Sequence, residues 1–331
     1  MSEPGVDSLL LTARAAAGAG AWGDVRTTLE RDEIGAMGDG SRAMLLGEAC
    51  LRTGDPRTAM RWLDLAEPML TKSGNRPSLR SVFNLQGAAA FAIGSLNRAA
   101  ESFSSALSMA QLDADALLSA RATNNLGLIS ALRGDVEAAI LSYQRAIAAY
   151  QRLGNPQGLA ESWHNLGISF RTRGELDAAE DAERRAIEFA TEATNPRLVA
   201  MAQVGRAEIS LRRGDAAWAR ATAWRASEVF SALPDFLMQA DALRVHADAS
   251  DRLGLASEAD FSFGRALTLS REHEHRTQEA QTLQTQAQIL ARRGAHDQAR
   301  AIGVEAREAF SQLGSVVAAE EMAEFLAGLP R

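Results

Sequence analysis

The chain has 331 residues, of which 46% are hydrophobic and 23% charged, with only 8 prolines and 5% aromatic residues. This is an ordinary soluble composition, and the scarcity of proline and aromatic side chains favours helices over a β-sandwich. The formal net charge of −7 argues against a nucleic-acid binder, because such proteins usually carry a basic stripe.

The N-terminal segment, MSEPGVDSLLLTARAAAG, has no basic lead-in and only a short apolar run. We therefore expect no signal peptide and no membrane span, and we expect a cytoplasmic location. Ser8 to Arg31 fits an irregular helical hairpin, and the glycine-rich stretch IGAMGDGS follows it. We expect residues 1–40 to form a degenerate capping hairpin and a glycine-rich loop, since a terminal repeat has one face in water.

A frame of small residues recurs every forty residues between residues 41 and 314, and one copy is Gly134, Ala139 and Ala146. The glycines of the seven copies are Gly54, Gly94, Gly134, Gly174, Gly214, Gly254 and Gly294. A glycine between two alanine-rich amphipathic stretches predicts a helix, a tight turn and a second helix. One such hairpin cannot bury its apolar face alone, so we expect seven stacked hairpins with a continuous core.

The connections between hairpins and the C-terminal segment carry their own signals. Asn155-Pro156 and Asn195-Pro196 lie forty residues apart, and an Asn-Pro pair favours a turn with a helix starting at or just after the proline. Residues 315–331 place Met322 and Phe325 on one side of a helix and glutamates on the other. This amphipathic pattern predicts a C-terminal capping helix, with a dimerisation or docking helix as the alternative.

One copy of the repeat carries a fuller pattern of aromatic, Leu-Gly, aromatic, Gly, Ala and Ala: Trp163, Leu166, Gly167, Phe170, Gly174, Ala179 and Ala186. This pattern resembles the tetratricopeptide repeat, and the resemblance extends over residues 40 to 310. The usual unit of that family has 34 residues. A forty-residue unit resembles the longer-helix variety of kinesin light chains, bacterial peptide-pheromone receptors and some bacterial regulators. The resemblance implies an all-α, right-handed α-solenoid of stacked helix-turn-helix repeats.

The sequence contains no recognisable catalytic or phosphate-binding motif, so we expect a non-enzymatic chain with no cofactor and no metal. Cys50 is the sole cysteine, and its place inside a predicted helix indicates a buried, inert thiol. His273, Glu274 and His275 could bind a divalent ion, but they lack the Cys/His company of a zinc site, and we interpret them as a solvated linker. His246 falls at a core-facing position, where we expect a packed, hydrogen-bonded side chain.

The resemblance further implies that the first helix of each unit lines a concave groove. The candidate partner-binding residues carried over onto this sequence are Asn84, Asn124, Asn125, His164, Asn165, Arg171, Arg212, Arg244, Arg252 and Arg292. Equivalent groove positions add Leu85, Phe91, Leu128, Ile168, Glu208, Asp241, Asp248, Asp251, Gln281, Gln284 and Gln288. The groove is thus predicted to be apolar with asparagines in its first half and charged in its second half.

The asparagines and arginines of the groove each allow two interpretations. Asn125 and Asn165 are equivalent residues one repeat apart, and an Asn amide can bond both the N–H and the C=O of an extended peptide. Alternatively, they bond only to neighbouring helices. Asp241 with Arg244 is an i,i+3 pair, and Arg244 with Asp248 and Asp248 with Arg252 are i,i+4 pairs. We interpret this ladder as charges that neutralise one another on the helix surface, with a ligand site as the alternative.

The other three arginines of the set, Arg171, Arg212 and Arg292, have no such ladder of nearby acids in the sequence. We interpret them as candidates for an acidic partner. Only Lys72 among the 35 basic residues is a lysine, and with the abundant alanine this usage indicates a G+C-rich bacterial genome.

The leading hypothesis is a scaffold or adaptor that binds a protein or peptide partner in its concave groove, as a bacterial regulatory subunit. The alternative is a sensor whose groove binds a signalling peptide or small molecule and modulates an effector. A third hypothesis is a structural oligomer assembled through the end caps. We expect no nucleic acid or membrane partner, and a monomer or a homodimer formed through the terminal helices.

Overall fold

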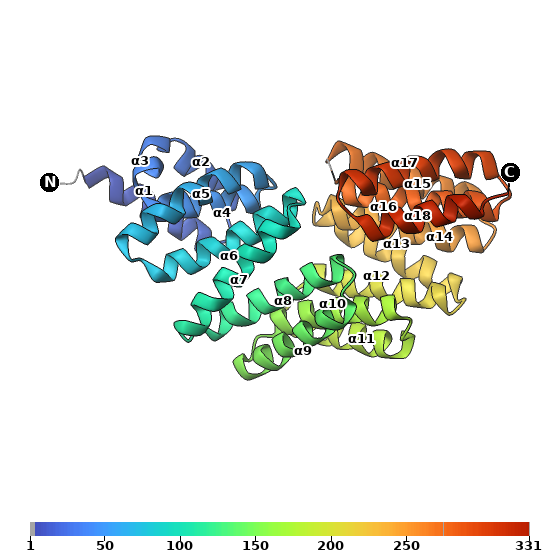
Figure 1. Ribbon diagram of the computed structural model, residues 1–331, viewed down its shortest axis with the longest axis horizontal. Coiled ribbons are helices and arrows are strands. Elements are labelled where there is room, and N and C mark those ends of the chain that lie inside the picture. The colour runs from blue at the N-terminus through green and yellow to red at the C-terminus, as the bar shows by residue number, and fades with distance from the viewer. Residues whose placement is uncertain (1–3, 274, 331) are drawn as a thin grey trace. The chain divides into compact units, whose positions relative to one another are not determined.

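The computed structural model describes residues 4–273 and 275–330 (Figure 1), and within these ranges every regular element is a helix. The predicted all-α class is therefore confirmed for the described part of the chain. Residues 1–3, 274 and 331 lie outside the described residues. The first residues of the expected N-terminal hairpin and Glu274 of the His-Glu-His stretch are among them. The chain divides into two compact units, Met1–Ile129 and Ser130–Arg331, with the boundary inside helix α8.

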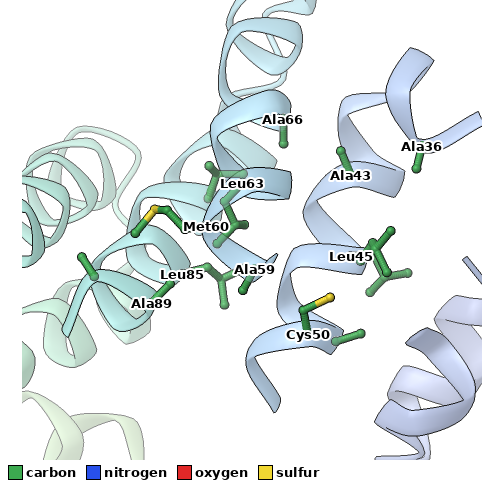
Figure 2. Close-up of a cluster of buried hydrophobic side chains, with 14 of the residues drawn as sticks. Ala36, Ala43, Leu45, Cys50, Ala59, Met60, Leu63, Ala66, Leu85 and Ala89 are labelled. Atoms are coloured by element: carbon green, nitrogen blue, oxygen red, sulfur yellow. The ribbon is translucent and has the colours of Figure 1, made fainter. Parts of the chain in front are cut away.

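The first unit consists of helices joined by short turns, built around alanine and leucine side chains. Its helices are α1 (Pro4–Gly18), α2 (Trp22–Glu30), α3 (Glu33–Gly38), α4 (Gly40–Arg52), α5 (Pro56–Ser73), α6 (Arg76–Ile93), α7 (Leu96–Leu112) and the larger part of α8 (Ala116–Leu132). Figure 2 shows α5 between α4 and α6, with Ala59 of α5 close to Leu85 of α6. Alanines at these contacts let the helix backbones approach closely.

The glycine-rich segment that we expected to be a loop contains the short helix α3, so that expectation is wrong. Ala36 of α3 is fully buried in the apolar core of the first unit. The Arg42 side chain of α4 is also buried, and it forms ion pairs with Asp32 and Asp39, one on each side of α3. Apolar contact and these two ion pairs hold the segment helical despite its glycines.

The second unit continues the pattern of helical pairs with nearly constant helix lengths. It begins with the last residues of α8 and contains α9 (Val136–Leu153), α10 (Pro156–Arg173), α11 (Leu176–Glu192), α12 (Pro196–Arg212), α13 (Ala216–Ala232), α14 (Phe236–Arg252), α15 (Ala256–Glu272), α16 (Arg276–Arg292), α17 (His296–Gln312) and α18 (Val316–Gly328). The final helix α18 buries Met322 and Leu326 against α17. Among the residues described, none of the helices is long and apolar enough to cross a lipid bilayer.

The predicted turn glycines lie in the turns between the two helices of each repeat. All seven have a positive φ, between 76° and 90°, a conformation that costs glycine little because it has no Cβ. The two Asn-Pro predictions are also confirmed, because α10 begins at Pro156 and α12 at Pro196. Each helix has the preceding asparagine as its N-cap, and the side chain accepts a hydrogen bond from a backbone N–H of the first turn.

The first helices of successive pairs lie together on one side of the second unit. Helix α10 packs against α12, α12 against α14, and α14 against α16, whereas α11, α13 and α15 make fewer contacts with one another. A stack whose first helices are closer together than its second helices curves toward the first helices. Helices α10, α12, α14 and α16 therefore form the inner, concave side of this unit, as the repeat pattern implied.

Candidate functional site

A cavity of about 310 Å³ lies on the inner side of the second unit. Helices α10, α12, α14 and α16 all contribute to its wall. The lining residues are His164, Ile168, Arg171, Met201, Val204, Gly205, Glu208, Met238, Asp241, Arg244, Gln281, Gln284 and Thr285. Its volume is that of a site for a small molecule or a short peptide segment. The four inner helices from α10 to α16 thus share one cavity.

Part of the cavity wall is apolar. Ile168 of α10, Met201 and Val204 of α12 and Met238 of α14 line it together. Methionine side chains are unbranched and polarizable, so they adapt to apolar groups of different shape. This part of the wall suits an aliphatic or aromatic side chain of a ligand.

A chain of ion pairs crosses the inner helices beside the apolar wall. Arg171 of α10 pairs with Glu208 of α12, and Glu208 also accepts a 2.7 Å hydrogen bond from Arg244 of α14. Arg244 bonds Asp241 at 2.7 Å, and Gln278 of α16 donates to the same oxygen of Asp241 at 2.8 Å. Each of the four helices is therefore connected to the next through polar side chains. The network fixes the spacing of the helices that line the cavity.

Several polar atoms of the cavity remain available to a ligand. A guanidinium has five N–H donors, and Arg171 uses one of them in its bond to Glu208. Asp241 accepts hydrogen bonds from Arg244 and Gln278 through Oδ1, which leaves Oδ2 for a ligand. The side-chain amides of Gln281 and Gln284 line the cavity and form no hydrogen bond within the described part of the chain. A ligand can thus meet donors on the α10 side and amides or a carboxylate oxygen on the α14 and α16 side.

A buried carboxylate lies behind this wall. Glu183 of α11 is 1% exposed, and its Oε2 is 2.9 Å from Nδ1 of His164, a cavity-lining residue. Gly167 of α10 and Gly205 of α12 make the room for it, because a Cβ on Gly205 would overlap the Glu183 carboxylate. His164 therefore connects the buried acid to the cavity.

Burial shapes the ionisation of the charged groups here. Loss of hydration raises the pKa of Glu183, and the nearby His164 and Arg171 partly oppose that shift. Burial also lowers the pKa of Arg171 to about 10, so its guanidinium still carries a positive charge at neutral pH. Asp241 has its pKa lowered because the favourable charge of Arg244 and its hydrogen bonds outweigh the cost of burial. The cavity thus holds charged groups of both signs.

The predicted groove residues of the first unit occupy α6 and α8. Asn84 is 8% exposed, and its Oδ1 has no hydrogen-bond partner in the described part of the chain. Asn124 is 7% exposed, and Asn125 is half-buried. Asn165 of the second unit is half-buried next to His164, but it does not line the cavity. The expected peptide-holding role of the asparagines stays a prediction.

Three of the predicted arginines lie away from the cavity and connect neighbouring inner helices. Arg212 donates to the backbone carbonyl of Arg171 at 2.7 Å, and Arg252 donates to that of Leu211 at 3.2 Å. Arg292 pairs with Asp248 at 2.5 Å, although the sequence shows no acid near it on its own helix. Its partner lies on α14, so spacing along one helix could not reveal it.

The local ion pairs predicted within α14 are formed in part. Asp241 with Arg244 and Asp248 with Arg252 are confirmed, at 2.7 Å and 3.1 Å. Arg244 does not continue the ladder to Asp248 but bonds Glu208 on α12. The acid on the neighbouring helix is more favourably placed for its second N–H group.

Sequence reasoning placed His164, Arg171 and Arg244 in the groove, and the structure brings all three to the cavity. It missed Glu183, although a signal was present. The residue nine positions after the turn glycine is apolar or small in the other six repeats, namely Leu63, Phe103, Tyr143, Ala223, Phe263 and Gly303. A carboxylate in a position that otherwise forms the core was therefore visible in the frame.

A second polar cluster has the composition of a catalytic triad. His246 lies 2.9 Å from both the Ser262 hydroxyl and the Glu258 carboxylate, and Arg220 also pairs with Glu258. Ser262 is fully buried, and no lining residue of the cavity belongs to the cluster. A nucleophile needs access to its substrate, so the cluster serves as a hydrogen-bonded core contact, which confirms the prediction made for His246.

No group of three metal-ligating side chains occurs among the side chains that the structure describes. In the expected linker, His273 stacks on Phe236 with ring centroids 3.8 Å apart, which adds a ring contact to an otherwise exposed segment. Cys50 is fully buried, and burial raises the pKa of its thiol to about 11, so it is an inert core residue as predicted.

The geometry defines an all-α repeat protein with a cavity on its concave side. Residues 118–192 match the family model described as tetratricopeptide repeat. The repeats within this segment are therefore of the tetratricopeptide type, as the sequence pattern predicted. No curated protein sequence matches the chain.

Solved structures show the same fold over nearly the whole chain. A Rap protein complexed with Competence and Sporulation Factor has a TM-score of 0.64 and 13% identity, covering 98% of this chain and 97% of that one. The quorum sensor NprR from B. thuringiensis, in its apo form, has a TM-score of 0.59 and 13% identity, with 98% of each chain covered. NprR in complex with its cognate peptide NprX has a TM-score of 0.62 and 14% identity, covering 86% and 84%. At this low sequence identity, the structural likeness shows a shared fold alone.

Proposed function

We propose that this chain is a non-enzymatic interaction protein that binds a peptide, or an extended segment of a protein, in the concave cavity of its second unit. The observation that carries the proposal is the convergence of four inner helices on a cavity with an apolar wall and uncommitted amides. Ile168, Met201 and Met238 can take an apolar side chain, while Gln281 and Gln284 can bond a peptide backbone. The likeness to NprR in complex with a peptide supports this proposal through the fold alone.

The test compares partners captured by matched variants. Gln281→Ala with Gln284→Ala removes both amides from the cavity, and Gln144→Ala with Gln151→Ala removes two exposed amides on α9, away from the cavity. Purified native chain and both variants are incubated with the peptide fraction and the protein fraction of a bacterial lysate, and bound material is identified by mass spectrometry. We expect a species that the native chain and the control variant retain and that the cavity variant loses. Equal retention by all three chains would contradict the proposal.

A sensor function is the second candidate, and the ion network favours it. Arg171, Glu208 and Arg244 connect three helices through charged bonds that a ligand can compete for. A ligand that replaces one partner changes the contacts that set the helix spacing, and a conformational change requires such a difference in contacts. Small-angle scattering with and without the captured ligand checks this candidate. If the scattering curves with and without saturating ligand coincide, the sensor function is contradicted and the adaptor function still holds.

A further inference from the structure

The starting observation is the chemistry of one repeat position. In the other six repeats it holds a leucine, a phenylalanine, a tyrosine, an alanine or a glycine, and in the α10–α11 repeat it holds Glu183. Gly87 faces Phe103 in the α6–α7 repeat just as Gly167 faces Glu183 in this one. A carboxylate buried to 1% exposure costs free energy that an apolar side chain would not. Such a departure from the local rule marks a functional residue.

The contact between Glu183 and His164 determines which way the imidazole can act. Glu183 bonds Nδ1 of His164, and Nε2, the other ring nitrogen, forms no hydrogen bond within the described residues. When the imidazole is neutral and Glu183 is ionised, Nδ1–H donates to the carboxylate and Nε2 is an acceptor. With one proton added on the imidazole, Nε2 carries an N–H. The same holds with the proton on Oε2 of Glu183, because the Oε2–H group then donates to Nδ1. One proton therefore converts Nε2 from an acceptor into a donor.

The charges around this pair favour an anion on the α10 side. His164 and Arg171 are two turns apart on α10, both line the cavity, and Arg171 retains free N–H donors. Both oxygens of Glu208 are bonded to arginines, so its charge is balanced. The charged groups around the pair and Arg171 come from α10, α11, α12 and α14: Arg171, Glu180, Arg206, Glu208, Arg212, Asp241 and Arg244. Glu180 is itself paired with Arg206 at 2.6 Å.

We propose that His164 and Arg171 bind a carboxylate of the ligand, and that Glu183 couples this binding to the uptake of one proton by the His164–Glu183 pair. The inference rests on the proposed function, since it names the chemical group that the cavity recognises. The carboxylate comes from the C-terminus of a peptide or from an acidic side chain. Binding then strengthens as the pH falls, because the Nε2–H donor exists only when the pair holds the proton.

The experiment uses small probes that differ in one group. Acetyl-leucine carries a terminal carboxylate, acetyl-leucinamide is its neutral match, and acetyl-aspartyl-leucinamide carries a side-chain carboxylate. The full chain is labelled with ¹³C at its 5 histidines, and the signal of His164 is assigned through its loss in His164→Gln. Each probe is titrated at pH 6.5 and pH 8.0.

We expect at least one acidic probe to move the His164 signal, with affinity at pH 6.5 at least threefold higher than at pH 8.0 and a limit of about tenfold per pH unit for one proton. A response to acetyl-leucine alone assigns the terminal carboxylate, and a response to the aspartyl probe alone assigns the side chain. An equal response to the neutral amide, or no His164 response to any probe, would overturn the proposal. Affinity that does not change with pH would overturn the coupling to a proton.

Variants separate this inference from a folding defect and from the proposed function. Glu183→Gln keeps the shape and removes the charge, so it should abolish the pH dependence, whereas Glu188→Gln on the exposed face of α11 should leave it unchanged. Both variants are first compared with the native chain in thermal unfolding. If the acidic probes fail while Gln281→Ala with Gln284→Ala still loses the captured ligand, the proposed function stands and this inference alone falls.

Discussion

The α6–α7 and α10–α11 repeats follow the same frame but fill its central position with opposite chemistry. In the first, the ring of Phe103 packs against the backbone at Gly87 and joins the apolar core. In the second, the carboxylate of Glu183 takes the corresponding place against Gly167 and bonds a histidine of the cavity wall. The same glycine thus serves close packing in one repeat and a polar contact in the other.

This difference shows where the chain gives up stability for a binding surface. A phenyl ring in the core stabilises the fold through buried apolar area and needs no partner. A buried carboxylate needs a hydrogen-bond donor and favourable charge, which His164 and Arg171 supply from the cavity wall. The repeat frame is therefore a scaffold whose core position can be reassigned where a site is required.

The largest loss of stability should come from placing a carboxylate at the core position of the α6–α7 repeat. Phe103→Glu removes a buried aromatic ring, worth about 3–5 kcal/mol, and buries a carboxylate without the histidine that serves Glu183. We expect the first unit to lose its cooperative unfolding transition, as measured by circular dichroism against temperature. Phe103→Leu is the control, for which a moderate drop in melting temperature is expected. A Phe103→Glu chain that melts like the native one would contradict the claim that a carboxylate at this position needs a partner such as His164.

Removing the shared acid of the ion network should have the next largest effect. Glu208→Ala leaves Arg171 and Arg244, both mostly buried, without their common partner. We expect a loss of about 2–3 kcal/mol, less than for a fully buried pair because these groups retain some contact with water. Urea unfolding measures the loss. Glu188→Ala, which breaks an exposed pair with Arg184, should cause no measurable change.

Replacing the buried polar pair with apolar side chains should increase stability. His164→Leu with Glu183→Met fills the same space without charged groups, and such replacements are often neutral or stabilise by about 1–4 kcal/mol. We expect a gain of about 1 kcal/mol in urea unfolding together with loss of the captured ligand. A large loss of stability would mean that the pair holds the fold together, contrary to the comparison.

The pH dependence of stability tests the Glu183 carboxyl directly. Burial raises the pKa of Glu183 in the folded chain, so between the usual carboxyl pKa and this raised value the folded chain binds more protons than the unfolded chain. The native chain should then lose stability relative to Glu183→Gln as the pH rises through that window. Urea unfolding of both chains from pH 4 upward measures the difference. A native chain that gains stability relative to Glu183→Gln as the pH rises through that window would contradict the assignment.

The smallest effect should be the same in both repeats. Ala114 after α7 and Thr194 after α11 have φ values of 53° and 50°, at the position where other connections have Gly74, Gly154 and Gly314. A residue with a Cβ is strained there, so Ala114→Gly and Thr194→Gly should each stabilise by about 0.5–1 kcal/mol. Thermal unfolding of the two single variants provides the measurement. Unequal gains would show that the two repeats differ in their backbones as well as in their core position.

The sequence alone determined the repeat, because a period depends only on local chemistry. Gly134 and its equivalents mark left-handed turns, Asn155-Pro156 marks a helix start, and the inner positions follow from the register of each helix. The register of each helix thus assigns Ile168, Glu208 and Gln281 to the groove, and they line the cavity. Asp248, Asp251 and Gln288 have equivalent positions but do not line it. The carried-over asparagines, by contrast, do not line it.

Tertiary structure decided which side chains meet. Arg171 with Glu208 and Arg292 with Asp248 join residues on different helices, at separations that no helical periodicity singles out. The contact of Glu183 with His164 likewise depends on how α11 packs between α10 and α12. Helix period fixes the direction of a side chain on its own helix, whereas the partner depends on the distance and angle of the neighbouring helix, which only packing sets.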